Sequence, residues 1–483
     1  ILTMKSYFGE KSDGKTPLFN LGLTSTKMIW IGFAAGFLSS FPATAAGFLP
    51  IPPIPYITDW VWNLTPNTYK FLPGANMYIR LTPAEIALGI FCPLDWLISC
   101  GLWTLLMNFI YNPIVATTGL LPYTPLVTEG PAGDFGSNQY ASTVGFKWNY
   151  WTLVGMPTGF GVYVLWQYRK HFIDTFKVAF GQGKDLPKDE DGVSYRTVVI
   201  GGLICFIVVV ALWTAGGMPI EVSVFSVLVF IIFNYGWTKV HALNPSNGGI
   251  SNVRDWAGYA YGAGQVTGHW GRPPDPAATN SMMMYMSLGP GMHRMAGYSM
   301  MFQLGNYKIA KEMNTSSKGV LIVSILTMVL VAVFGYPFYL WWVHTMGGYN
   351  KMNLTGFGDA RTAAAEWWSY TYGTPTPRAY DYLSYTISGT AVVFVCAFLR
   401  ARFPWFIINP AGFVLAYHWP NMVAALVIKY VFLKVGGVRK FETYALPFGA
   451  TYCLGYGTST VISGMYVFFS RCVPEFLVRM RPV

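Results

Sequence analysis

Residues 197–239 read TVVIGGLICFIVVVALWTAGGMPIEVSVFSVLVFIIFNYGWTK, which is two apolar runs joined by the turn sequence Gly216-Gly217-Met218-Pro219. Each run is about 20 residues long, enough for a helix to cross the ~30 Å hydrocarbon core of a bilayer. Glycine pairs and proline interrupt helices and mark turns. The stretch therefore predicts a tight hairpin of two membrane-spanning helices, at about 197–215 and 219–239.

Comparable apolar runs recur along the chain, which has 483 residues, 53% of them hydrophobic and only 11% charged. Soluble domains carry about 25% charged residues. The runs are continuous rather than alternating, which favours helices over a transmembrane barrel as the way to satisfy backbone polar groups in lipid. We expect an all-α, polytopic transmembrane helix bundle with about 9–11 membrane segments, some of them broken or re-entrant as in transporters.

We expect a single membrane domain, 1–483, made of three parts. The first helix group covers 1–240 and includes a charged loop at 169–196. The region 241–318 is rich in Gly and Met, too polar for an ordinary span and too apolar for a solvated linker. Because irregular backbone at membrane depth occurs only inside protein or along a cavity, this composition predicts an irregular or re-entrant segment. The second helix group covers 319–483.

The net charge of +11 comes from Lys and Arg residues that lie mostly in short segments between apolar runs. This is the pattern of the positive-inside rule, and it places the loop 169–196 in the cytoplasm. The sequence contains no motif for RNA or DNA binding. The expected partner is therefore the lipid bilayer, and not nucleic acid.

Two interrupted segments are the first candidates for a functional site, namely Asn244–Gly249 (NPSNGG) and Asn409–Gly412 (NPAG). Each is an Asn-Pro pair followed by glycine, which breaks a helix and leaves peptide groups unpaired. Such groups cost several kcal/mol in lipid, so they commonly face a cavity, an ion or a substrate, roughly as in transporters. The alternative is a plain proline kink repaired by neighbouring helices. The candidate binding residues are Asn244, Gly248, Asn409 and Gly412.

Two ionisable residues lie inside apolar runs. Asp95 follows Pro93 in the interrupted run 83–112, where Cys92-Pro93-Leu94-Asp95 breaks the pattern. It is a candidate proton- or cation-binding group, with a hydrogen-bonded or interfacial carboxylate as the alternative. Lys429 lies near an expected cytoplasmic end, and we expect it to extend toward the interface.

Histidines and methionines raise the question of a metal. His241 lies near the first Asn-Pro break and His418 follows the second, so both are candidate polar partners in the binding site. A Met cluster at 282–301 would suit Cu(I), but methionine also fills irregular apolar gaps. No histidine pair has a zinc-helix spacing, no cysteines form a C-x-x-C pair, and no Walker, HExxH or nucleophile-elbow motif is present. We expect no metal, no cofactor and no enzymatic activity.

Four stretches resemble uncharacterised prokaryotic membrane proteins related to the oligopeptide transporter superfamily. Their order and spacing carry the likeness, which extends from about residue 20 to 470. The stretches are Gln139–Arg169, Tyr195–His241, Asn306–Lys311, and Phe406–Phe413 with Lys434–Gly437 after it.

The resemblance implies a transporter-like bundle with pseudo-symmetric halves in a prokaryotic plasma membrane, moving small peptides or metal chelates, commonly with protons. This chain is shorter than those relatives and begins at Ile1 without an initiator Met. The resemblance implies that the leading helices of the fold are missing and that a further chain supplies them or that they lie outside this sequence. His241 stands where relatives tend to have an acidic residue, which weakens the case for proton coupling.

Three functions remain open at this point. The first is a transporter that works by alternating access around the broken helices, with Asp95, His241 and His418 as polar partners. The second is a structural subunit of a larger membrane complex, or a homo-oligomer, that has reused a transporter fold. The third is a metal- or haem-binding redox subunit built on the His- and Met-rich region.

Overall fold

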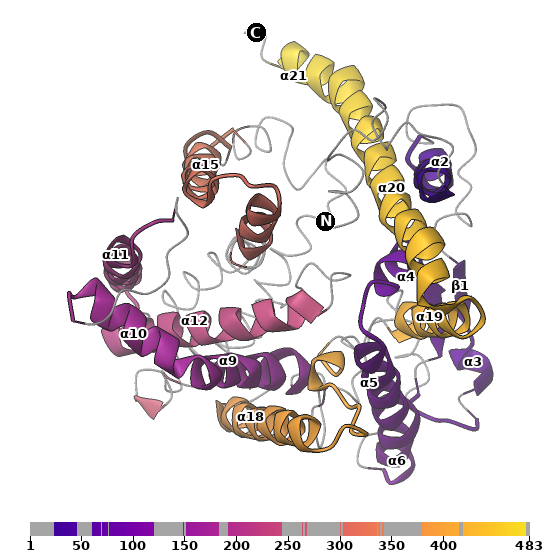
Figure 1. Cartoon of the computed structure of the whole chain (residues 1–483), viewed down its shortest axis with the longest axis horizontal. Helices are drawn as coiled ribbons and strands as arrows, with labels where there is room; N and C mark the ends of the chain where they lie inside the picture. The colour runs from indigo at the N-terminus through magenta and orange to yellow at the C-terminus, as the bar shows by residue number, and fades with distance from the viewer. Residues whose placement is uncertain are drawn as a thin grey trace.

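The computed structural model of the chain is shown in Figure 1. It describes residues 24–45, 60–68, 70–75, 77–119, 148, 151–182, 192–243, 263, 266–267, 300, 303–335, 337–338, 341, 379–414 and 419–479. Among the elements it describes, helices dominate. A two-stranded antiparallel sheet, β1 (Trp60–Asn63) with β2 (Tyr78–Leu81), is the exception. The described residues therefore form an all-α polytopic bundle, as the sequence predicts.

The helices fall into three stretches of the chain. The first holds α2 (Thr24–Ala45), α3 (Thr65–Thr68), α4 (Pro83–Gly89), α5 (Leu94–Thr104), the π-helix η3 (Leu105–Tyr111) and α6 (Asn112–Thr117). The second holds η6 (Trp151–Gly155), α9 (Met156–Gln167), α10 (Arg169–Ala179), α11 (Tyr195–Ala215) and α12 (Ile220–Leu243). The third holds α15 (Ser317–Leu330), η7 (Val331–Gly335), α18 (Ala379–Arg402), η9 (Pro410–Gly412), α19 (Trp419–Lys440), η11 (Phe441–Ala445), α20 (Leu446–Val467), η12 (Phe468–Cys472) and α21 (Val473–Arg479).

Six helical stretches among the described residues are long and apolar enough to cross a membrane. They are Leu94–Thr117, Tyr195–Ala215, Ile220–Leu243, Ser317–Gly335, Leu383–Arg402 and Trp419–Ser470. The last covers 52 residues, and its backbone turns at Gly437, where φ is 69°. Positive φ favours glycine, and α19 and α20 run in different directions on either side of this turn (Figure 1). The chain is a multi-pass membrane protein.

The two helices and the turn predicted at 197–239 are present, as α11 and α12, but Figure 1 shows α11 end-on and α12 lengthwise, so the two helices cross steeply and do not form a tight hairpin. Ser194 caps α11 by accepting a hydrogen bond from the N–H of Thr197, and Gly217 adopts φ of 100° in the turn before α12. The polar Gly-Gly-Met-Pro sequence ends one helix and starts the next, because proline fits the start of a helix but not its interior.

Helices pack closely where glycine removes the side chain from the contact. A Cβ added at Gly161 of α9 or at Gly236 of α12 would meet backbone atoms of the other helix, and one added at Gly455 of α20 would meet the backbone of α2. Small residues allow such approach, which is typical of helix pairs in membranes. Ser39 and Tyr452 add a hydroxyl–hydroxyl bond of 2.7 Å between α2 and α20.

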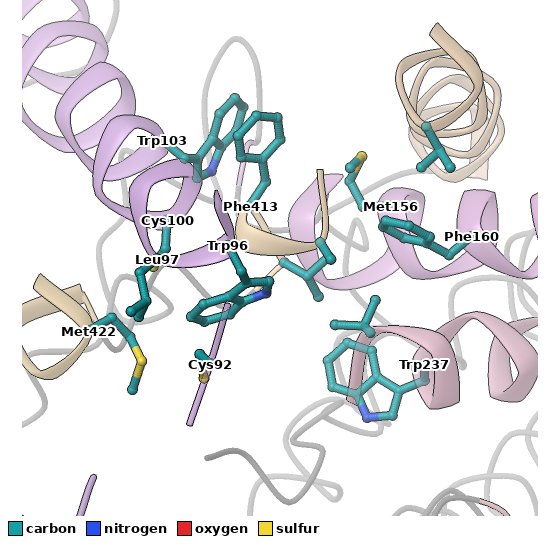
Figure 2. Packing of buried hydrophobic residues seen from close by; sticks show 14 of the residues in the cluster. Cys92, Trp96, Leu97, Cys100, Trp103, Met156, Phe160, Trp237, Phe413 and Met422 are labelled. Atoms are coloured by element: carbon teal, nitrogen blue, oxygen red, sulfur yellow. The ribbon is translucent and has the colours of Figure 1, made fainter. Parts of the chain in front are cut away.

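The buried core is centred on α5. Figure 2 shows Trp103 lying against Phe413, with Trp96 below them and the helices that carry Met156 and Trp237 to one side. Trp103 stacks between two rings, Trp151 at 5.1 Å and Phe413 at 4.8 Å between centroids. Offset-stacked aromatic pairs of this kind each contribute about 0.5–1.5 kcal/mol beyond their burial.

The structure corrects the sequence reading at the segment 169–196, which is predicted as a charged loop but contains the helix α10. It also adds the small sheet of β1 and β2, which no apolar run predicts.

Candidate functional site at the break between α4 and α5

The apolar run 83–112 is interrupted where the sequence predicts. Helix α4 ends at Gly89, and Pro93 takes an extended conformation (φ −59°, ψ 147°) immediately before α5. Proline has no N–H to donate and cannot continue the preceding helix. The carbonyl groups of Ile90 and Cys92 lie at this interruption.

Lys429 of α19 is a hydrogen-bond donor to both carbonyl groups. Its ammonium donates hydrogen bonds to the carbonyl oxygens of Ile90 at 3.1 Å and Cys92 at 2.6 Å, and it lies 5.3 Å from the centre of the Phe441 ring. A cation at the C-terminal end of a helix also favours the helix dipole. The sequence predicts that Lys429 extends toward the interface, and the structure places its ammonium at the break between α4 and α5.

Helix α19 holds the other end of α4 as well. The side-chain oxygen of Asn421 accepts from the N–H of Thr82 at 2.8 Å, and its amide nitrogen donates to the carboxylate of Glu85. Asn421 is 4% exposed. Asn421 binds residues at the start of α4, and Lys429 binds the residue that follows its end. Helix α19 therefore contacts α4 at both of its ends.

The second interruption, at Asn409–Gly412, packs against α5. The N–H of Asn409 donates to Ser99 Oγ at 2.7 Å, and the Asn409 side-chain oxygen accepts from the N–H of Ala411 at 3.1 Å. Gly412 lies against the α5 backbone, where an added Cβ would be 2.6 Å from the carbonyl oxygen of Trp96. These contacts satisfy the peptide groups that the Asn-Pro break exposes.

Opposite charges meet where the two interruptions touch. Arg400 Nη1 lies 2.7 Å from Asp95 Oδ2, and Asn409 Nδ2 donates to the same oxygen at 3.1 Å. Asp95 lies in the first turn of α5, where a negative charge favours the helix dipole. The Arg400 side chain is 37% exposed and the Asp95 side chain 26%, so the protein covers this pair only in part.

Buried donors without acceptors lie on the same stretch of helix. Within the described part of the chain, Nε1 of Trp96, Nε1 of Trp103 and Nδ2 of Asn112 are buried and have no hydrogen-bond partner. The nitrogen of Trp96 points toward the side on which Met156 and Trp237 lie (Figure 2). A buried donor left unpaired costs about 1–3 kcal/mol, so this region favours a group that supplies acceptor oxygens.

The structure brings together three of the predicted site residues, Asp95, Asn409 and Gly412. His241 lies half-buried in the last turn of α12. Asn244, Gly248 and His418 lie outside the described residues, so a meeting of the two Asn-Pro breaks stays a prediction. The interruption that meets Asn409 in the described structure is the one at Pro93.

Sequence reasoning missed Arg400, Ser99 and Asn421 as parts of this site. Arg400 follows an apolar run, where a basic residue by itself indicates only a cytoplasmic helix end, and Ser99 and Asn421 lack any local pattern that separates them from other small polar residues. The one available signal was the pairing rule for charges in membranes, since an Asp in an apolar run requires a partner.

Metal-binding residues do not gather in the part of the chain that the structure describes, which holds no group of three or more His, Cys, Asp or Glu side chains placed to bind an ion. The Met cluster at 282–301 lies almost wholly outside it.

Comparison with known protein families identifies one family. No curated protein matches the chain. Residues 10–472 match a protein family described as a family of unknown function, DUF6785. Because the match takes in nearly the whole sequence, including both interruptions and the Asp95–Arg400 pair, the chain belongs to the DUF6785 family.

Proposed function

We propose that this protein is a transporter of the prokaryotic plasma membrane that moves a small solute, such as a short peptide or a metal chelate, by alternating access. The observation that supports this is the contact between two interrupted membrane segments at a partly exposed ion pair, Asp95 with Arg400. Interrupted helices form solute sites in many transporters, because their free ends supply fixed partial charges without a bulky side chain.

The ion pair suits a solute that carries both charges. A guanidinium binds a carboxylate through two parallel hydrogen bonds, so Arg400 can exchange Asp95 for a solute carboxylate. Asp95 then becomes free to accept from a solute ammonium group, with Asn409 keeping its oxygen oriented. A zwitterionic peptide replaces each partner of the pair with a group of the same charge, so neither residue is left uncompensated.

The unpaired donors extend this preference beyond the two charges. Trp96 and Trp103 are seven residues apart on α5, about two helical turns, and therefore share one face of the helix. Their indole N–H groups lack acceptors within the described residues. The peptide carbonyls of a short peptide, or the carboxylate oxygens of a metal chelate, supply acceptors of that kind.

Alternating access requires a place where the chain can bend, and the proposal assigns it to residues 90–93. On one side of this hinge α4 is bound to α19 through Asn421, and Lys429 of α19 binds the hinge itself at the carbonyl oxygens of Ile90 and Cys92. On the other side α5 is bound to η9 through Ser99 and Asn409. Hinges of this type concentrate the change in φ and ψ in a few residues between rigid elements.

Uptake into proteoliposomes tests the proposal. The purified chain is reconstituted and exposed to labelled di- and tripeptides, metal-loaded chelates, and single amino acids as small controls. The expected result is accumulation of peptide or chelate above empty liposomes. Absence of uptake for every solute, by protein that remains monodisperse after reconstitution, would contradict the proposal.

A second function, a structural subunit of a larger membrane complex, is favoured by one specific observation. Helix α15 and the following η7 contain no buried residue, and none of the apolar window in Ser317–Gly335 is buried by the described parts of this chain. Lipid or a partner helix must cover this surface. Native mass spectrometry of protein purified from its own membranes separates the two cases, because a fixed set of co-purifying subunits supports the structural role.

A further inference from the structure

Helix α10 (Arg169–Ala179) follows the C-terminal end of α9 almost directly, since a single residue, Tyr168, separates the two helices. One side of α10 is fixed against the bundle. The Phe172 ring meets Tyr235 of α12 edge-on at 5.7 Å, and Ala179 is 3% exposed. Figure 1 shows α10 running past α11 and the end of α9. The position of the helix is therefore set by packing and does not depend on the loop after it.

A second side of α10 is apolar and uncovered. Ile173, Phe176 and Phe180 are 51%, 47% and 61% exposed. With 3.6 residues per turn these three positions share one face, about a quarter turn from the packed side. Three large apolar side chains on one face are unfavourable for a helix that projects into water, and 11 residues are too few to cross a bilayer. The end of α9 adds Trp166 and Tyr168, which are also exposed and typical of the membrane interface.

A third side, opposite the packed one, carries Lys170 and Lys177. They are seven residues apart and therefore aligned along the helix. Within the described residues neither lysine has an ion-pair partner. Arg169 is different, because its guanidinium donates to the Trp166 carbonyl at 2.8 Å and lies over the Trp166 ring.

The remaining side of α10 carries the exposed residues Asp174 and His171, and His171 lies about half a turn from the apolar face. Going around the helix, the order is protein, apolar surface, lysines and then a polar side. This is the order that a helix meets when it lies flat at the edge of a membrane protein, with the bundle beside it, acyl chains below, headgroups on the far side and water above.

We infer that α10 is an interfacial helix that binds anionic lipid headgroups through Lys170 and Lys177 while Ile173, Phe176 and Phe180 enter the acyl region. The inference does not depend on transport. Lysines adjacent to an anionic leaflet are attracted to it, and the attraction weakens with salt.

The depth of α10 is tested on the full chain in nanodiscs of equimolar phosphatidylcholine and phosphatidylglycerol. Nitroxide labels are placed by His171→Cys, Ile173→Cys and Phe176→Cys in a background where the exposed Cys205 is replaced by Ser. Labels at 173 and 176 should be accessible to oxygen and protected from a water-soluble nickel chelate, and the label at 171 should show the reverse. Equal nickel access at all three positions would overturn the inference.

The headgroup contact is tested separately by native mass spectrometry of protein released from the same nanodiscs. The double variant Lys170→Gln with Lys177→Gln should retain about two-fold fewer phosphatidylglycerol molecules at low salt. The matched control is Lys308→Gln with Lys318→Gln, which removes the same charge from exposed positions elsewhere and should retain the wild-type number. Equal retention by wild type and the α10 variant would overturn the headgroup contact.

Discussion

Arg400 Nη1 lies 2.7 Å from Asp95 Oδ2, joining the last turn of α18 to the first turn of α5. Both side chains are partly exposed, so the pair contributes little to stability, about 0.2–1 kcal/mol. It also keeps two opposite charges compensated between membrane helices. Under the transport function proposed above, a solute replaces one partner of this pair at the contact between the two interrupted segments.

Arg400→Gln and Asp95→Asn should each reduce solute uptake about ten-fold or more, equivalent to about 1.4 kcal/mol of binding or barrier. The thermal midpoint in detergent should change little, because an exposed pair contributes little to stability. Uptake by proteoliposomes and a fluorescence-monitored melting curve check the two parts. Arg402→Gln is the matched control, since Arg402 lies on the same helix and is exposed. A similar loss of uptake in this control would assign the effect to net charge instead.

Trp103→Phe and Trp151→Phe should differ in stability, because only one of the two indole N–H groups has a hydrogen-bond acceptor in the described part of the chain. Trp151 Nε1 donates to Ser388 Oγ at 2.9 Å, whereas Trp103 Nε1 has no acceptor in the described residues. Both substitutions keep a ring in the stack and remove a similar volume. The free energy of unfolding of Trp151→Phe should therefore be lower than that of Trp103→Phe by about 0.5–1.5 kcal/mol, the net value of one hydrogen bond.

The effect of the two substitutions on uptake should follow the opposite order to their effect on stability. Trp103→Phe should raise the KM for uptake, because a donor available to the solute is lost, while Trp151→Phe should leave KM near the wild-type value. Denaturant melts and concentration-dependent uptake provide the readouts. Unchanged KM in Trp103→Phe would remove this indole from the proposed solute site.

Gly412→Ala should destabilise the protein by about 1–3 kcal/mol, the usual cost of overpacking. The added methyl group would lie 2.6 Å from the Trp96 carbonyl oxygen and 2.9 Å from the Cys100 nitrogen, which are backbone atoms that cannot rotate away. Gly457→Ala is the control, because nothing lies within 4 Å of a Cβ there. Size-exclusion chromatography after heating measures both, and equal behaviour of the two variants would refute the close approach of η9 to α5.

Lys429→Met should cost about 1–3 kcal/mol, because the Ile90 and Cys92 carbonyl groups would lose their donor inside the bundle. Lys434→Met tests the same chemical change at an exposed position and should be close to neutral. The comparison is made by thermal melting at matched detergent concentration. A thermal midpoint for Lys429→Met equal to that of the wild type would show that the ammonium does not stabilise the carbonyl groups between α4 and α5.

Helices and turns that depend only on neighbouring residues were predictable from the sequence. The helices α11 and α12 and the turn at Gly217 follow from two apolar runs and a glycine pair, and the interruption at Pro93 follows from a proline that cannot continue a helix. Both are confirmed. Their prediction needed no information about distant parts of the chain.

The partners across the bundle were not predictable in the same way. Asn421 and Lys429 are residues of one apolar helix, and nothing local indicates that they bind the two ends of α4. Helix α10 was missed because its charges resemble those of a loop, and its apolar face is clear only once the packed face is known. The Asn244 break and His418 stay predictions, since they lie outside the described residues.

A density map of the full chain in nanodiscs with saturating transported peptide tests the central claim most directly. We predict peptide density beside α5 and η9, with its carboxylate against Arg400, its ammonium against Asp95, and the direct contact between those two residues broken. An intact Asp95–Arg400 pair under conditions where peptide is bound elsewhere, or where no peptide binds, would contradict the account.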